Sequence, residues 1–481
     1  MRFLRGQVRT ALALAALALA LAAWLAGASD ARRRPHRPPR PPVVLENLRP
    51  GTPSWNLPDA RTSIEGYASQ VSALPGGAVQ LHVSTSPEAR YQVRVYRLGW
   101  YRGDGARLLA CLPGCGLDEQ GAEQPVGSPD PQTGYLRADW PVTDKFFVGR
   151  AWISGYYLIQ LKLTSGPKSG SAGWIPLVVR SAAKRASAIL VQVPINTWQA
   201  YNDWGGKSLY ATPAGPGANH VSFDRPYDRQ QQGMFNWEYQ LVRFLERGGY
   251  DVSYTTDVDT DLHPAELLRH KLVMTAGHSE YWTRRMFDEF VAARDRGVNL
   301  AFMGANTAYW QIRYEDAHRT IVEYRSNELD PEPNPALKTN RFRRLMPPRP
   351  ECKLVGVQID QGVGTSHDFT VNAAALGDPW LRGTGFTAGS VLPGLVGYEW
   401  DGVVRGCRVP APTVLFQYEG PPSNADTVRY VAPSGARVFA TGSLQFTWGL
   451  DSFGGHQADP RLQRFMRHAL ADLTKRHARG S

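Results

Sequence analysis

The stretch KLVMTAGHSEYWTRRMFDEFVAARDRGVNLAFMGANT, residues 271–307, decides the fold class of this chain. It opens with the short apolar run Lys271–Ala276 and closes with a second such run, Asn299–Gly304. The segment between them has helical periodicity, with Thr283 placed to cap a helix whose apolar face carries Met286, Phe287 and Phe290. Short apolar strands that alternate with amphipathic helices are typical of a sheet of buried parallel strands.

The same alternation of short apolar strands and amphipathic helices continues on both sides of this stretch. Further buried strands are predicted at Ile189–Pro194, Val252–Thr256 and Val438–Gly442. Further helices are predicted over Asn236–Arg247 and from Asp459 onward, where Pro460 favours a helix start. We therefore expect an open, doubly wound α/β domain. Residues 311–434 interrupt the rhythm and predict an inserted, irregular β-rich subdomain that forms one wall or the lid of a site.

The region before the α/β domain has a different pattern. Apolar and polar residues alternate in short runs separated by turn residues, at Gln80–Ser84, Tyr91–Trp100 and Tyr157–Leu163, with Trp174–Arg180 closing the segment. This pattern predicts an antiparallel β-sandwich of immunoglobulin-like type. The expected domains are the sandwich at 51–182, the α/β domain at 183–310 and 435–476, and the insertion at 311–434.

The N-terminus predicts export. Three arginines precede the apolar run Ala11–Leu25, and Ala26-Gly27-Ala28 gives a cleavage pattern for a signal peptide at 1–28. Arg32–Arg34 would also suit an uncleaved membrane anchor, so both readings stay open. A Pro/Arg-rich linker follows at 29–50. We expect a secreted, periplasmic or cell-surface protein.

Charge and cysteine content narrow the function classes. Residues 1–40 hold eight arginines and one aspartate, so +7 of the net charge of +11 lies in that segment. The remaining chain is nearly balanced, which argues against a nucleic-acid partner. The four cysteines allow three pairings, of which the local one, Cys111 with Cys115 and Cys352 with Cys407, is the simplest.

Polar side chains follow three of the predicted parallel strands. Tyr201 follows the first strand, His278 and Glu280 follow Lys271–Ala276, and Asn306 follows Asn299–Gly304. Because ligands of open α/β sheets bind outside the carboxyl ends of the strands, we expect these four side chains to face one crevice. Each could also have a purely structural role. Tyr201 could be a core residue and His278 a turn residue bonded to the backbone. Glu280 could be an acid at a helix start, and Asn306 a turn former.

The residue types in this crevice suit metal-assisted hydrolysis. A phenolate and a carboxylate are hard oxygen ligands, as ferric iron prefers. His278 could act as a general base or acid, and Asn306 could hydrogen-bond a polarised oxygen. The sequence contains no GxSxG elbow, and its cysteines stand in no helix-start context, so a serine or cysteine nucleophile is disfavoured.

Several motifs resemble the catalytic domain of the N,N-dimethylformamidase large (β) subunit family. They are TWQAYNDWGGKSLY (197–210), AGHSEYWT (276–283) and FMGANTAYW (302–310), with VYRLGWYRGDGAR (95–107), LVGYEWDG (395–402) and TGSLQFTWGLD (441–451) fitting the same wider family. The resemblance implies cleavage of a small amide at one ferric ion per chain, held by two tyrosinates and one glutamate. It implies Tyr201, Glu280 and Tyr157 as ligands, with Tyr156 in reserve for Tyr157, and His278, Asn306 and Glu399 in the substrate pocket.

We therefore expect an exported amidohydrolase with a small-molecule amide substrate; the sequence leaves the oligomeric state open, a homo-oligomer included. Two other classes remain open. The tryptophans of the sandwich (Trp100, Trp140, Trp152 and Trp174) would suit a carbohydrate- or surface-binding protein with a non-catalytic α/β domain. Glu280 and Glu399 would suit the carboxylate pair of a glycoside hydrolase.

Overall fold

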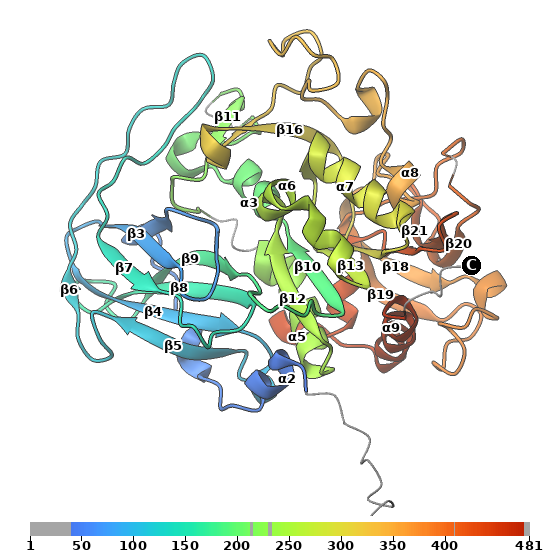
Figure 1. The fold of residues 1–481 in the computed structure, drawn as a ribbon, viewed down its shortest axis with the longest axis horizontal. Helices are drawn as coiled ribbons and strands as arrows, with labels where there is room; N and C mark the ends of the chain where they lie inside the picture. The colour runs from blue at the N-terminus through green and yellow to red at the C-terminus, as the bar shows by residue number, and fades with distance from the viewer. Residues whose placement is uncertain (1–39, 212–214, 229–232, 408, 476–481) are drawn as a thin grey trace, which may run out of the picture. The chain divides into compact units, whose positions relative to one another are not determined.

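A nine-stranded sheet forms the centre of the α/β region in the computed structural model, which describes residues 40–211, 215–228, 233–407 and 409–475 (Figure 1). Five of its strands are parallel and lie in the order β12 (Val252–Thr256), β10 (Ile189–Val193), β13 (Leu272–Ala276), β15 (Asn299–Met303) and β22 (Arg437–Ala440). The five predicted buried strands are therefore present and parallel. Because β10 pairs with both β12 and β13, the direction in which strands are added reverses there, which is where open sheets bind ligands.

Helices cover both faces of the parallel strands. Helices α5 (Tyr239–Arg247) and α9 (Pro460–Leu473) share a hydrophobic core with Ile189 and Val191 of β10. Helix α7 (Arg284–Asp295) belongs to a second core, which contains Leu190 of the same strand. Alternate residues of one strand thus point to opposite faces, and each face is closed by apolar helical side chains.

The residues predicted to start two of the helices do so through hydrogen bonds to their nearest neighbours. The Thr283 side chain accepts a hydrogen bond from the Met286 backbone N–H, and the Asp459 side chain accepts from Arg461 and Leu462, so both caps start their helices. The helix predicted from Asn236 begins at Tyr239 as α5 and is preceded by a π-helical turn, η4 (Met234–Glu238).

Four antiparallel strands extend the central sheet beyond β22. In spatial order they are β21 (Ala425–Val431), β20 (Thr413–Tyr418), β18 (Val363–Val371) and β19 (Val391–Glu399). These strands belong to the segment expected as an insertion, and they continue the central sheet instead of forming a sheet of their own. A separate four-stranded sheet contains β11 (His220–Ser222), β17 (Thr320–Val322), β16 (Trp310–Glu315) and β14 (Tyr281–Thr283).

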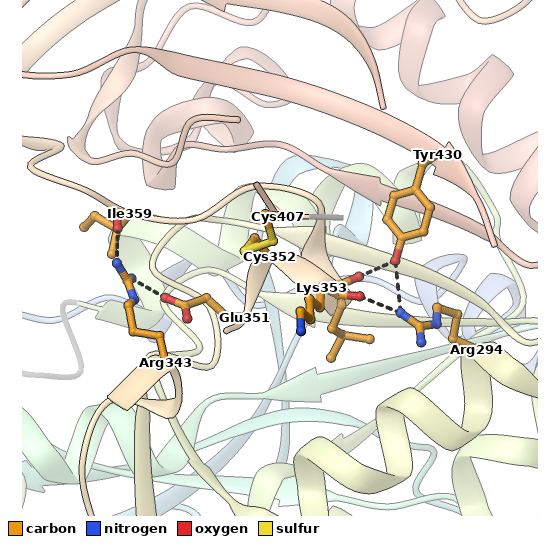
Figure 2. The surroundings of a disulfide bond; sticks show 9 residues. Arg294, Arg343, Glu351, Cys352, Lys353, Ile359, Cys407 and Tyr430 are labelled. Atoms are coloured by element: carbon orange, nitrogen blue, oxygen red, sulfur yellow. Dashed lines mark hydrogen bonds and ion pairs between the residues drawn. A yellow bond between two sulfur atoms is a disulfide. The ribbon is translucent and has the colours of Figure 1, made fainter. Parts of the chain in front are cut away.

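Short helix α8 (Cys352–Val355) links this extension to the rest of the α/β region. Figure 2 shows its Cys352–Cys407 disulfide and, beside it, Arg294 of α7, which donates to the Lys353 carbonyl oxygen at 2.7 Å. Tyr430 of β21 donates to the Leu354 carbonyl oxygen at 2.5 Å. The two hydrogen bonds hold α8 against α7 and β21, and the disulfide ties it to the loop that contains Cys407.

The N-terminal region is built from two β-sheets that share one core. The smaller sheet contains β1 (Ile64–Ala68), β3 (Ala78–Thr85) and β7 (Asp144–Phe147). The larger contains β2 (Ser72–Ala73), β9 (Ala172–Val179), β8 (Gly155–Leu163), β4 (Arg90–Leu98) and β5 (Ala106–Leu112), with β6 (Glu119–Gln120) paired to β4. The chain is thus a mixed α/β protein rich in strands, and the immunoglobulin-like type of its N-terminal region stays a prediction.

A buried ion pair joins the N-terminal sheets to the α/β region. Arg97 of β4 contacts Glu246 of α5 at 2.7 Å, and both side chains are fully buried. Tyr254 and Asn47 (the latter from α2, Pro42–Asn47) also donate to the Glu246 carboxylate. From Pro41 onward the chain forms one compact unit.

Both predicted disulfides, Cys111–Cys115 and Cys352–Cys407, are confirmed, and they account for all four cysteines. Within the described part of the chain, no helix is both long enough and apolar enough to cross a membrane. The apolar run Ala11–Leu25, on which the export prediction rests, lies outside that part.

Candidate functional site

The candidate site lies at the carboxyl ends of the parallel strands. Tyr201 is the last residue of α3 (Ile195–Tyr201), the short helix that follows β10. His278 and Glu280 lie in the loop between β13 and β14, and the Glu280 backbone N–H donates to the Thr197 hydroxyl at 3.0 Å. This hydrogen bond fixes the loop after β13 against the helix after β10, and so brings the expected residues together.

Two tyrosines converge on Glu280. The Tyr201 hydroxyl donates to the Glu280 carboxylate at 2.9 Å, and the Tyr210 hydroxyl donates to the Tyr201 hydroxyl at 2.8 Å. Tyr210 also lies 3.2 and 3.3 Å from the two Glu280 oxygens. Stacking of the Tyr201 and Tyr210 rings, with centroids 4.4 Å apart, holds both phenols on the same side of the carboxylate.

A second layer supports these phenols. The Tyr281 hydroxyl donates to the Tyr210 hydroxyl at 2.6 Å, and Arg325 donates to the Tyr281 hydroxyl at 2.8 Å. The Arg325 guanidinium also lies 4.2 Å from the centroid of the Tyr210 ring and pairs with Glu323 at 2.9 Å. One positive charge is therefore held directly behind the tyrosine cluster.

His278 bridges two carboxylates. Its Nε2 atom lies 2.9 Å from Glu399 at the end of β19 and 3.2 Å from Glu280. Asn306 donates its side-chain amide to Glu399 at 3.0 Å and its backbone N–H to Asp401 at 2.9 Å. Asn306 has a positive φ of 51°, a conformation that asparagine tolerates better than most residues, and this turn aims its amide at Glu399.

Burial and charge set the protonation of this cluster. Burial alone would lower the pKa of His278, but the carboxylates of Glu399 and Glu280 outweigh it and raise that pKa to about 9. Burial raises the pKa of Glu280 to about 7, against the opposing charge of His278. The pKa of Glu399 would also rise on burial, but His278 and Asn306 hold it below its ordinary value. The site thus contains an imidazolium between one ionised carboxylate and one that ionises near neutrality.

The phenols favour the neutral form in this environment. Burial, followed by the charge of Glu280, raises the pKa of both Tyr201 and Tyr210 well above the ordinary value. A phenolate would become stable here only if a cation compensated its charge.

The oxygen atoms of this cluster fit a hard cation. Within the described residues, no group of three or more His, Cys, Asp or Glu side chains could hold a metal ion. The phenol oxygens of Tyr201 and Tyr210 and the carboxylate of Glu280 nevertheless lie within 2.8–3.3 Å of one another. Three oxygen donors at mutual contact distance are a donor set that hard cations prefer.

A cavity of about 220 Å³ opens onto the cluster. Its lining includes Trp198, Tyr201, Trp237, Glu238, His278 and Tyr398. Glu238 is fully buried and accepts from Tyr156 at 2.7 Å and from the Trp198 indole at 2.8 Å. Burial raises the pKa of Glu238 to about 8, so a largely protonated acid forms part of the cavity wall at neutral pH.

Tyr157 lies elsewhere. Its hydroxyl donates to the Ile153 carbonyl oxygen at 2.7 Å, its ring stacks on Trp152, and it belongs to the hydrophobic core of the N-terminal sheets. Strand β8 alternates between two faces, so Tyr157 shares the inward face with Ile159 and Leu161. Tyr156 points the opposite way and reaches Glu238, not Glu280.

Several residues of the site were not expected from the sequence. Tyr210 ends the motif TWQAYNDWGGKSLY, so its position nine residues after Tyr201 was a signal that could have been used. Tyr281 directly follows Glu280 in the motif AGHSEYWT, but it belongs to β14, a short strand that the sequence did not predict. Asp401 lies two residues after Glu399 in the motif LVGYEWDG, which was a second usable signal. Arg325 lies in a segment without a regular pattern, and its place in the site depends on tertiary contacts.

Comparison with known proteins gives the family. The family model "N,N-dimethylformamidase beta subunit-like, C-terminal" matches residues 92–460. Two N,N-dimethylformamidase beta subunits are similar over shorter segments: one from Alcaligenes sp is 30% identical over 124 residues, and one from Paracoccus aminophilus is 28% identical over 137 residues. These segments cover 23% and 26% of this chain, but only 16% and 18% of the two relatives. The family match covers both the phenol–carboxylate cluster and the His278–Glu399 pair, and the chain belongs to the N,N-dimethylformamidase beta subunit-like family.

Proposed function

We propose that the chain hydrolyses the carbon–nitrogen bond of an amide at a ferric site. The observation that carries the proposal is the convergence of two phenols on Glu280, directly beside the His278–Glu399 pair and at the wall of a cavity. Membership of the family supports amide hydrolysis as the reaction class, because the matched relatives are named N,N-dimethylformamidase beta subunits.

The proposed iron ligands are Tyr201, Tyr210 and Glu280. Tyr210 takes the place expected for Tyr157, because its hydroxyl contacts both Tyr201 and Glu280, whereas Tyr157 bonds to the Ile153 carbonyl. When bound, the ion would act as a Lewis acid toward the amide carbonyl and would stabilise the two phenolates. The Arg325 charge beside the Tyr210 ring would further favour deprotonation of Tyr210.

His278 and Glu399 would carry the protons of the reaction. Glu399 is placed to take a proton from a water molecule as the water oxygen bonds to the carbonyl carbon. His278 Nε2, 2.9 Å from Glu399, is placed to deliver a proton to the departing nitrogen when the carbon–nitrogen bond breaks. Asn306 holds the Glu399 carboxylate in position. The products are a carboxylic acid and an amine. Glu399 then passes the proton taken from water to His278, 2.9 Å away, which restores both side chains.

We further propose that the enzyme works outside the cytoplasm, with an N-terminal β-sandwich of immunoglobulin-like type. The signal pattern at 1–28 supports export, and two disulfides are usual in an oxidising compartment. The substrate would be a small-molecule amide, and neither a nucleic-acid partner nor a membrane contact beyond the N-terminus is needed.

The tryptophans of the N-terminal region give little support to a surface-binding role. Trp140 is 4% exposed, and Trp152 and Trp174 pack against hydrophobic cores. Trp100 is covered by the guanidinium groups of Arg243 and Arg247, at 4.8 and 5.1 Å. These side chains are engaged inside the protein and do not form a platform for a sugar.

The deciding experiment compares Glu280→Gln with the wild type and with Glu65→Gln. Glu65 is a matched control, because it is a partly buried acid bonded to the Trp204 indole and lies outside the cluster. We expect about one iron per wild-type chain and a tyrosinate-to-iron absorption band, both lost in Glu280→Gln and kept in Glu65→Gln. Iron that remains bound in folded Glu280→Gln, with the band unchanged, would overturn the ligand assignment.

A further inference from the structure

A second and larger cavity, of about 800 Å³, is not used by the proposed reaction. It lies between the beginning of β19, the short helix η9 (Leu444–Gly449) and the start of α9. Its size is in the range of about 300–1,000 Å³ that holds drug-sized ligands. The side chains that line it include Leu392, Leu395, Trp448, His456, Arg461 and Arg464.

The two cavities share an aromatic wall. Trp237 lines the smaller cavity and Trp448 lines the larger, and their rings stack with centroids 5.4 Å apart and planes within 9°. The His456 ring stacks on Trp448 at 4.0 Å and continues this wall along the larger cavity. The Trp448 indole donates to the Asn236 carbonyl oxygen at 2.5 Å, and the Thr447 hydroxyl donates to the Trp237 carbonyl oxygen at 3.1 Å. These bonds fix the wall in place.

Strand β19 also connects the two cavities. Leu392 and Leu395 line the larger cavity, whereas Tyr398 lines the smaller one and is 48% exposed. The next residue is Glu399, which contacts His278. A molecule that follows this strand from the larger cavity passes Tyr398 and arrives beside the proposed catalytic pair.

The chemistry of the larger cavity favours an apolar or aromatic occupant. The Trp448–His456 stack supplies flat aromatic surface, whereas Leu392 and Leu395 are only 0% and 6% exposed. Of the two guanidinium groups, Arg461 is paired with Asp459 at 2.7 Å, and Arg464 donates to the Thr384 carbonyl oxygen at 2.8 Å. Both are thus engaged by the protein.

We propose that one substrate occupies both cavities: an amide with a bulky apolar, preferably aromatic, substituent, whose amide group lies in the smaller cavity and whose substituent lies in the larger. This inference rests on the proposed amide hydrolysis and names its substrate class. A small dialkyl amide would fill only the smaller cavity and would leave the apolar surface of the larger one exposed to water.

The test fills the larger cavity without touching the site. Ala458→Trp and Gln457→Trp each place an indole in its lining, and Ala183→Trp adds the same side chain at an exposed position outside both linings. The iron-loaded full chain is assayed with N,N-dimethylformamide and with N-(1-naphthyl)acetamide. We expect kcat/KM for the naphthyl amide to fall at least about tenfold in both filled variants, while the small amide and the Ala183→Trp variant are unaffected.

Equal losses for both amides, or no loss for the naphthyl amide, would overturn the inference. Calorimetric titration with N-(1-naphthyl)acetamide separates this failure from a failure of the proposed function, because it needs no turnover. If the wild type cleaves neither amide, the proposed function fails; weaker naphthyl binding in both filled variants would still support the larger cavity as its site. Equal binding by wild type and filled variants would rule that site out.

Discussion

Two regions of the molecule bury carboxylates beside a cation, and they do so in different ways. At the contact between the N-terminal sheets and α5, Glu246 receives hydrogen bonds from both terminal nitrogens of Arg97 and further ones from Tyr254 and Asn47. One acid meets one base in a fork-to-fork arrangement, and four donors surround the carboxylate. This is the pattern of a buried ion pair that stabilises a fixed contact.

At the candidate site the balance is different. One histidine serves two acids, Glu280 and Glu399, and two phenols crowd onto the first of them. Two polar atoms nearby, the Asn306 side-chain oxygen and the Thr307 hydroxyl, are buried without a hydrogen-bond partner in the described structure. The Arg97 Nε atom is also buried without a partner in the described structure, so such atoms alone do not separate the two regions. The excess of acid over base at the candidate site does separate them, and it indicates a functional role.

The largest expected effect on folding comes from breaking the interface pair. Arg97→Leu leaves Glu246 buried without its partner, so we expect the free energy of unfolding to fall by about 3–5 kcal/mol. Guanidinium unfolding measures this loss. The double variant Arg97→Leu/Glu246→Leu should recover much of it, because neither charge then remains, and kcat per folded molecule should not change. If the free energy of unfolding of Arg97→Leu falls by less than about 1 kcal/mol, Arg97 and Glu246 are not a tightly coupled pair.

Removing the cation from the candidate site should affect activity as well as stability. In His278→Gln we expect kcat for an amide to fall by about 10²–10⁴-fold. Folding stability should fall too, because Glu399 is then buried without its cation. His270→Gln is the control, because His270 is also buried but bonds to the Ser187 carbonyl oxygen at 2.9 Å, outside the site. Equal activity of the two variants would remove His278 from the proposed reaction.

Glu65 offers a third kind of acid, which is only partly buried and whose hydrogen bond comes from a neutral group. Burial, opposed by the Trp204 indole at 2.9 Å, raises the pKa of Glu65 from 4.5 to about 7. The folded state therefore holds this proton more tightly than the unfolded state, and its stabilising effect is present at acidic pH and lost as pH rises from 4.5 to about 7.

Glu65→Gln should abolish this loss. As the pH rises from 5 to 8, the free energy of unfolding should fall by up to about 2 kcal/mol more in the wild type than in the variant. Unfolding of both proteins at the two pH values measures this difference. A difference that does not change with pH would show that Glu65 ionises freely in the folded protein.

The local signals of the sequence predicted much of the fold. Buried strands such as Leu272–Ala276 were found because short apolar runs bounded by turn residues favour buried strands, and the caps Thr283 and Asp459 act through their nearest neighbours. The extension of the central sheet by β18–β21 was not predicted. Antiparallel register depends on which edge is available, and the free edge of β22 is defined only once the parallel strands have assembled.

The site was partly predictable because most of its residues directly follow strands that the sequence does predict. Tyr201, His278, Glu280 and Asn306 follow parallel strands, and the topology of the sheet brings those ends together. Arg325 has no such signal: it lies in an irregular segment with a positive φ of 56°, and only the folded chain places it behind Tyr210.

The smallest expected effect decides between two tyrosines. Tyr157→Phe removes the hydrogen bond to the Ile153 carbonyl oxygen, which should cost about 0.5–1.5 kcal/mol of stability and leave iron content and the visible band unchanged. Tyr210→Phe removes a phenol that contacts both Tyr201 and Glu280, so the band should shift or weaken while the fold is kept. Metal analysis and absorption spectra of the two variants, which lose the same atom, compare them directly. Loss of the band in Tyr157→Phe alone would return the third ligand to the N-terminal sheets, and would require that strand β8 turn its inward face toward Glu280.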